Sequence, residues 1–236
     1  GGIFIYLSLK IEPGPTGAGT TMKGKNMPET PKPMEQIKNY DELYRNFTWE
    51  IPEYYNFGFD VVDKWAEDRT KLALISIDRT GKHDRYHTFF DLSRDSDLFA
   101  AVLQKIGLKK GDRVLVILQS IPEWYIALIA MTKLGVIPMP GTVLLTSKDI
   151  EYRINRAEAS MVLTDLDHAD SVDVAKASCP TLRHMMLVDG KRAGWFNYDE
   201  EMHEIKEPID NAVDRLVADR EKEGRTLHTE LAKRTR

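Results

Sequence analysis

The stretch GDRVLVILQSIPEWYIALIAMTKLGVIPMP (residues 111–140) decides the fold of this chain. Its first nine residues begin with a Gly-Asp turn and become a continuous apolar run, which is typical of a strand buried on both faces. Ser120 and Glu123 have the spacing of a capping box, so we expect a helix to begin here and to end at Gly135. The last five residues form a second short apolar strand. Strand, helix and strand in this order predict a parallel βαβ unit.

The same alternation continues on both sides of this unit. Upstream, two strand-like runs flank Thr80-Gly81 and predict a β-hairpin, and an amphipathic helix follows that ends at Gly107. Downstream, Thr146 repeats the cap pattern and opens a further helix. The remaining elements are strands over 161–165 and 182–190 and a helix over 167–178. We therefore expect an α/β fold: a layered, open, mainly parallel sheet with flanking helices, preceded by a β-hairpin.

Composition narrows the class of protein. The 236 residues include 33 Lys+Arg and 37 Asp+Glu, for a formal net charge of −4, and 42% are hydrophobic. That apolar fraction can build a core, and a chain without a basic block does not fit nucleic-acid binding by phosphate neutralisation. The one cysteine, Cys179, cannot form an internal disulfide, which fits a reducing compartment. Since no apolar run approaches the ~20 residues of a membrane helix, we predict a cytoplasmic protein.

The two ends differ from the middle of the chain. Residues 13–35 are rich in Gly, Pro and Thr and lack apolar periodicity, so 1–35 are predicted to be a flexible leader. Residues 36–207 carry the predicted globular domain. Residues 208–236 are highly charged and have apolar residues at helical spacing, which predicts a helical or disordered tail.

Several residues match parts of catalytic or metal motifs without their structural context. Gly19–Lys25 fits the letters G-x-x-x-x-G-K, but Asn26 follows where Ser or Thr is needed, so we interpret the match as coincidence. His83 and His87 would lie about 13 Å apart on a strand, at ~3.3 Å per residue, too far to bind one metal. No ligand spacing joins the other histidines, which are His168, His184, His203 and His228. No nucleophile-elbow motif surrounds the candidate nucleophiles Ser93, Ser120 and Cys179.

Three carboxylates follow the strand predicted over 161–165. They are Asp165, Asp167 and Asp170. In open α/β sheets, ligands bind at the carboxyl ends of the strands, so these side chains could take part in a site. Asp165 or Asp167 could instead cap the next helix, and this is the interpretation that we favour.

From about residue 55 to 200, the chain resembles the N-terminal portion of AMP-forming acyl-CoA synthetases, in particular the medium-chain type. The resemblance depends on the blocks at 55–78 and 107–165 and, more loosely, at 187–201. The middle block is the most specific, because order, spacing and composition agree over some sixty positions. It implies the incomplete N-terminal part of the adenylate-forming fold, with 36–207 as a partial N-terminal domain.

The resemblance also implies an activity. Members of this family activate a carboxylic acid, here a medium-chain fatty acid or a related one, as an acyl-adenylate with ATP and Mg²⁺, and then transfer it to coenzyme A. The family's Thr/Ser/Gly-rich phosphate loop and its adenylation lysine have no counterpart in these 236 residues. We therefore predict a chain that is inactive alone and that could self-associate through an exposed sheet edge. The alternative is a non-catalytic α/β binding or interaction module.

One family contact falls within the resemblance. The loop after the strand at 136–140 corresponds to a family loop near coenzyme A, which implies Gly141, Thr142 and Leu144 as binding residues. Related members have a glutamine at the position of Leu144, and leucine cannot supply its amide. The competing interpretation is a plain strand-to-helix turn, with Thr146 as the helix cap.

Overall fold

The computed structural model describes residues 40–49, 52–78, 80–81 and 84–211. They fall into two units, one ending at Tyr55 and the other beginning at Asn56. The first unit contains the helix α1 (Tyr40–Asn46), in which the rings of Tyr40 and Tyr44 stack at 6.1 Å. The predicted leader, the Gly19–Lys25 match, His83 and the tail beyond residue 211 lie outside the described residues.

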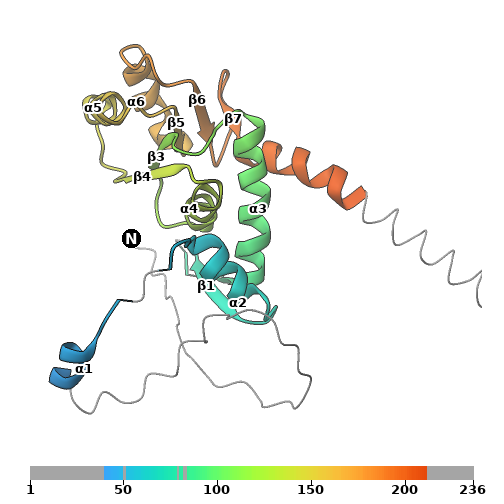
Figure 1. Cartoon of the computed structure of the whole chain (residues 1–236). Coiled ribbons are helices and arrows are strands. Elements are labelled where there is room, and N and C mark those ends of the chain that lie inside the picture. The colour runs from blue at the N-terminus through green and yellow to red at the C-terminus, as the bar shows by residue number, and fades with distance from the viewer. Residues whose placement is uncertain (1–39, 50–51, 79, 82–83, 212–236) are drawn as a thin grey trace, which may run out of the picture. The chain divides into compact units, whose positions relative to one another are not determined.

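The second unit is built on a parallel sheet of five strands (Figure 1). The strands are β3 (Arg113–Ile117), β4 (Ile137–Gly141), β5 (Met161–Thr164), β6 (His184–Leu187) and β7 (Phe196–Asn197). Their order is β4-β3-β5-β6-β7, and every pairing is parallel. The chain therefore moves outward from β3 to β4 and then crosses back over β3 to β5. This confirms the predicted open parallel sheet.

Helices cover both faces of the sheet (Figure 1). One face packs against α3 (Phe89–Lys105) and α4 (Pro122–Leu134), and the other against α5 (Ser147–Ala157) and α6 (Leu166–Lys176). Alternate residues of β3 enter the two cores: Val114 and Val116 on the α4 side, Leu115 and Ile117 on the α5 side. The α4 and α5 crossovers run in opposite directions across the sheet, so right-handedness places them on opposite faces.

The predicted start of α4 is wrong by one residue. Ile121, not Ser120, is the N-cap, and no side chain caps this helix. Pro122 takes the first helical position, where its fixed φ fits, and it forces the preceding residue into the extended conformation seen at Ile121 (φ −100°, ψ 162°). The predicted end is confirmed, because Gly135 closes the helix in the left-handed conformation at φ 74°.

The predicted β-hairpin precedes the sheet. Its strands β1 (Leu72–Ile77) and β2 (Asp84–Thr88) are antiparallel. Thr88 also caps α3: its hydroxyl accepts from the Asp91 N–H, while the Asp91 carboxylate accepts from the Thr88 N–H. The pKa of Asp91 is lowered, because its carboxylate accepts hydrogen bonds from both the backbone N–H and the hydroxyl of Thr88, and these favour the ionised form.

A π-helix that the sequence pattern did not predict docks beside α4. This segment, η1 (Gly58–Asp63), continues into the short α2 (Lys64–Ala66). Lys133 of α4 anchors it: the ammonium lies 2.7 Å from Asp63 Oδ1 and 2.6 Å from Asp97 Oδ1. The Lys133 side chain is 2% exposed, so the charge is buried among its partners.

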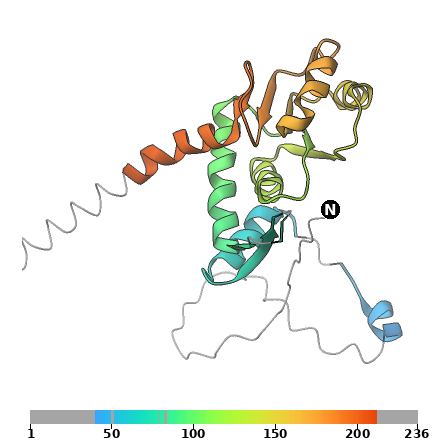
Figure 2. The same ribbon diagram turned by 180° about the vertical axis from the view of Figure 1, so that it is seen from behind.

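A final helix over residues 198–211 leaves the sheet beside α3 (Figure 2). The buried Tyr198 ring packs against Phe99 at 4.9 Å, and Lys105 forms ion pairs with Glu201 and Glu204. Residues 208–211 are the described part of the predicted tail and continue this helix. Among the residues that the structure describes, no helix combines the length and apolar character needed to cross a membrane.

Candidate functional site

The carboxyl edge of the parallel sheet is the candidate site. All strands of a parallel sheet end at the same edge, and ligands bind where the strand order reverses. That reversal lies between β3 and β5. After β3 the chain adds β4 on one side, and after β5 it adds β6 and β7 on the other side. The Thr164 hydroxyl donates to the Ile117 carbonyl at 2.9 Å and joins the ends of these two strands. The loops that follow β4, β5 and β6 surround this point.

The loop after β4 brings the three predicted site residues together in a defined shape. Gly141 lies over the buried Leu145, so close that a Cβ on Gly141 would come within 2.8 Å of Leu145 Cδ1. The Thr142 hydroxyl accepts from the Leu144 N–H at 3.3 Å. Leu144 itself is 83% exposed. The loop therefore offers a supported backbone and one apolar side chain to solvent, and no charge.

The turn interpretation of this loop is confirmed at its end. Thr146 caps α5 in a capping box with Asp149, as its spacing predicted. The hydrogen bonds from Thr146 lower the pKa of the exposed Asp149. A helix cap does not exclude a ligand contact by the preceding residues, so the coenzyme A role of the loop stays a prediction.

His168 of α6 holds this loop from the other side of the site. Its Nε2 lies 2.9 Å from the carbonyl oxygen of Val143, and its Nδ1 contacts the Asp165 carboxylate. Sequence reasoning missed this residue and treated it as an isolated histidine. The available signal was the Asp165-x-x-His168 spacing, which places both side chains at the first turn of a helix that follows a buried strand.

Of the three aspartates predicted after β5, one caps a helix, one forms an ion pair and one is exposed. Asp165 is the N-cap of α6 and accepts from the His168 N–H at 3.2 Å, which confirms the favoured interpretation. Asp189, from the loop after β6, accepts from the Leu166 N–H at 2.7 Å. These two bonds use the first donors of the helix. Asp170 pairs with Arg192, whereas Asp167 is exposed. Within the described ranges, no group of three His, Cys, Asp or Glu side chains could hold a metal ion.

The candidate nucleophiles lie in structural settings. Ser93 Oγ donates to Asp63 Oδ1 at 2.7 Å beside the buried Lys133. Ser120 is exposed before α4. Cys179 is buried, and this burial raises the pKa of its thiol, as expected of an inert structural cysteine.

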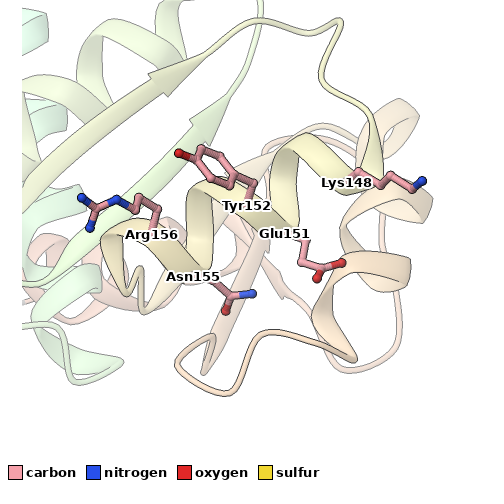
Figure 3. A pocket seen from close by; sticks show the side chains of 5 residues that line it. All are labelled: Lys148, Glu151, Tyr152, Asn155 and Arg156. Atoms are coloured by element: carbon pink, nitrogen blue, oxygen red, sulfur yellow. The ribbon is translucent and has the colours of Figure 1, made fainter.

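A shallow surface hollow of about 640 Å³ lies along α5 (Figure 3). All of the residues that line it come from this one helix; they are Lys148, Glu151, Tyr152, Asn155 and Arg156. The side chains spread from the helix in different directions and do not converge on one point (Figure 3). The hollow is therefore an open groove beside a helix, separate from the loop that carries Leu144.

Comparison with known proteins identifies the family of this chain. The family model described as AMP-binding enzyme matches residues 62–224. Acyl-coenzyme A synthetase ACSM3, mitochondrial, of Rattus norvegicus is 38% identical over 176 residues, which cover 71% of this chain and 30% of that protein. Acyl-coenzyme A synthetase ACSM5, mitochondrial, of Rattus norvegicus is 35% identical over 169 residues, covering 65% and 29%. The chain thus spans about 30% of the length of the curated relatives that it matches.

Solved structures share the fold. The anthranilate CoA ligase AuaEII, crystallised with anthranoyl-AMP, aligns with a TM-score of 0.58 at 20% identity, over 65% of this chain and 29% of that one. A putative long-chain-fatty-acid CoA ligase from Rhodopseudomonas palustris aligns with a TM-score of 0.56 at 19% identity, over 63% and 36%. At this level of identity, the likeness concerns the fold alone.

Proposed function

Because the chain belongs to the AMP-binding enzyme family, we propose that residues 36–207 are part of the N-terminal domain of an acid–CoA ligase. The substrate is a medium-chain fatty acid or a related carboxylic acid. The observation that carries the proposal is the family match over residues 62–224, together with the two ACSM relatives, which are 38% and 35% identical to this chain. The non-catalytic module that the sequence left as an alternative gains no support from these relatives.

The proposed chemistry has two steps. The carboxylate of the acid attacks the α-phosphate of ATP, which gives acyl-adenylate and pyrophosphate; the coenzyme A thiol then displaces AMP. Such steps depend on groups that position two anions and stabilise the developing charge. Mg²⁺ would neutralise part of the phosphate charge, but the described residues include no group of three His, Cys, Asp or Glu side chains that could hold it. We therefore assign no step of the reaction to a metal held by these residues.

The contribution that we propose for this region is a contact to coenzyme A. Gly141, Thr142 and Leu144 form the loop after β4 at the carboxyl edge, where sheets of this type bind ligands. Its backbone is supported by the buried Leu145 and by His168 through Val143. The exposed Leu144 offers van der Waals contact rather than a side-chain amide.

A graft tests the proposal directly. Residues 55–200 would replace the matching region of the Rattus norvegicus ACSM3 synthetase, and formation of acyl-CoA from medium-chain acids would be measured. We expect a folded, active chimera, because the grafted region provides scaffold and a loop contact while the rest of the synthetase supplies the phosphate-binding groups. A chimera that melts cooperatively but forms neither acyl-adenylate nor acyl-CoA would contradict the proposal.

The 236-residue polypeptide alone should behave differently. Because we expect neither the phosphate loop nor the adenylation lysine of the family in these residues, the polypeptide alone should give no ATP–pyrophosphate exchange with medium-chain acids. Clear exchange would show that these residues hold triphosphate by groups that we have not identified. Isothermal titration with coenzyme A measures the loop contact separately.

Location and assembly complete the proposal. A cytoplasmic location stays a prediction; the relatives' names carry the word mitochondrial, which favours the mitochondrion for this protein as well. Imaging of the tagged protein in its own cells would decide between the two compartments. Self-association through the exposed sheet edge also stays a prediction.

A further inference from the structure

We propose that His168 is a positioning residue that holds the β4–α5 loop against α6, and that it does so as the doubly protonated imidazolium. The inference deepens the proposed function, because the coenzyme A contact assigned to this loop depends on it. The ring joins two segments that adjacent strand pairing does not connect. Its nitrogens reach Val143 in the loop after β4 and Asp165 at the start of α6.

The protonation state follows from the partners. A backbone carbonyl only accepts hydrogen bonds, and so does an ionised carboxylate. A neutral imidazole has one N–H and one acceptor nitrogen, so it can satisfy only one of these two partners. With both ring nitrogens facing acceptors, the fully bonded state is the imidazolium, which donates to Val143 O and to Asp165. Loss of one proton leaves one nitrogen lone pair facing an oxygen.

The two contacts of His168, with Val143 and with Asp165, form a clamp that lies next to the predicted ligand contact. β3 lies between β4 and β5 in the sheet, so the loop after β4 and the start of α6 are not held together by strand pairing. His168 bridges that distance and fixes the carbonyl of Val143, the residue directly before the exposed Leu144. Leu145 anchors the other side of Leu144 in the core. The position of the exposed residue is thus set by one apolar and one polar anchor.

The pH dependence of His168 must be distinguished from that of the charged groups around it. On α6 and its cap these are Asp165, Asp167 and Asp170; on the loop after β6 they are Asp189 and Arg192; on α5 they are Lys148 and Asp149. In model peptides, carboxylates titrate near 4 and Lys and Arg above 10, so only a histidine changes charge between about pH 5 and 8. The other histidines in the described region are His87, His184 and His203, and their NMR signals must be assigned individually.

The first measurement needs no ligand and no altered core. The full chain, labelled with ¹⁵N-histidine, would be followed by NMR from pH 5 to 9, with His168→Gln used to assign the signal. We expect both ring nitrogens of His168 to carry protons wherever the loop is held, and the loop to loosen where the ring becomes neutral. A loop that stays held while the ring is neutral, with one nitrogen shifted to the unprotonated range, would overturn the inference.

Hydrogen exchange measures the clamp itself. The Gln side chain in His168→Gln carries both of its N–H donors on one nitrogen, so it cannot span the two partners that the two ring nitrogens reach. Amide exchange over residues 142–146 should therefore speed up about tenfold relative to intrinsic rates. In the unaltered chain, the same loss should appear as pH rises through the His168 transition, whereas His168→Gln should show no such step. His203→Gln, on the exposed side of the 198–211 helix, is the matched control and should change neither. Unchanged exchange in His168→Gln would also overturn the inference.

Coenzyme A titration at pH 6 and pH 8.5 separates this inference from the proposed function. Binding that weakens at pH 8.5 in the unaltered chain, but not in His168→Gln, supports both. A loop that loosens with pH while coenzyme A binds at neither pH supports the clamp and counts against the loop contact. Binding with no effect of pH or of His168→Gln on loop exchange supports the contact and refutes the clamp.

Discussion

Lys133, Asp63 and Asp97 form an ion cluster. Replacing its members should show which charge lowers the free energy of unfolding most when it loses its partners. The Lys133 side chain is 2% exposed, whereas those of Asp63 and Asp97 are 31% and 59% exposed. The ammonium also lies 3.3 Å from the Ser93 carbonyl. The cation is therefore buried, while both carboxylates keep contact with water. This asymmetry predicts unequal effects of removing the two kinds of charge.

The expected magnitudes follow from burial. Asp63→Asn with Asp97→Asn leaves a buried ammonium without a counter-charge, a change that costs about 3–5 kcal/mol. We expect about 3 kcal/mol, because the amide oxygens still accept from the ammonium. Lys133→Met removes the buried charge and leaves carboxylates that water already reaches, so about 1 kcal/mol should be lost. Adding Lys133→Met to the double variant should then restore roughly 2 kcal/mol.

Urea unfolding at 25 °C, followed by circular dichroism, measures these differences. A typical domain has a free energy of unfolding of about 5–15 kcal/mol, so a loss of 3 kcal/mol is readily resolved. The triple variant is the internal control, since it differs from the double variant only in the buried charge. If Lys133→Met is more destabilising than the double aspartate variant, or if it fails to rescue that variant, the reasoning from burial is refuted.

Three further predictions concern single residues of the same unit. Gly135→Ala places a Cβ at φ 74° and should cost about 1–2 kcal/mol in urea unfolding; no loss would show that α4 ends differently. Gly141→Ala should cost about 1 kcal/mol because its Cβ meets Leu145 Cδ1, and the cost should shrink in a Leu145→Ala background, a coupling that a double-mutant cycle measures. The lowered pKa of Asp91 contributes stability that is present above the unfolded-state pKa and lost as pH falls through the folded-state pKa. Between pH 6 and pH 3, the unaltered chain should thus lose more stability than Asp91→Asn, and equal losses would contradict this.

The parts of the fold that sequence predicted are those with a local cause. β3 and β5 are apolar on both faces because helices cover both, so their continuous runs identified them. Gly135 and Thr146 mark a helix end and a helix start by their own conformational and hydrogen-bonding properties. The Ser120 cap failed because the proline two residues later set the first helical position.

The parts that sequence missed depend on contacts between distant residues. The π-helix η1 follows Asn56, whose amide donates to the Thr132 carbonyl at 2.8 Å, and Lys133 Cγ lies 2.4 Å from where a Cβ on Gly58 would be. A local pattern does not contain an interaction across 76 positions. His168 was missed for the same reason, because its contact to Val143 connects the loop after β4 to the first turn of α6, and only the sheet order brings these two segments together.

The same sheet order gives a physical reason why the predicted self-association should not use the β4 edge and would have to use the other outer strand, β7. The Ile137 N–H donates to the Asp112 carbonyl beside β3, and backbone groups of a strand point alternately to either side, so Met139 and Gly141 also face β3. Pro138 and Pro140 therefore face the free edge, where neither can donate a hydrogen bond.

An incoming strand would find carbonyl oxygens on this edge and no N–H groups from the interior of β4. We expect the unaltered chain to stay monomeric at this edge, and Pro138→Val with Pro140→Thr to associate in a concentration-dependent way by sedimentation velocity. Pro180→Val, at an exposed loop proline, is the control and should not change the association. Equal association of all three proteins would show that the prolines do not protect the edge, and that another surface of the chain governs its assembly.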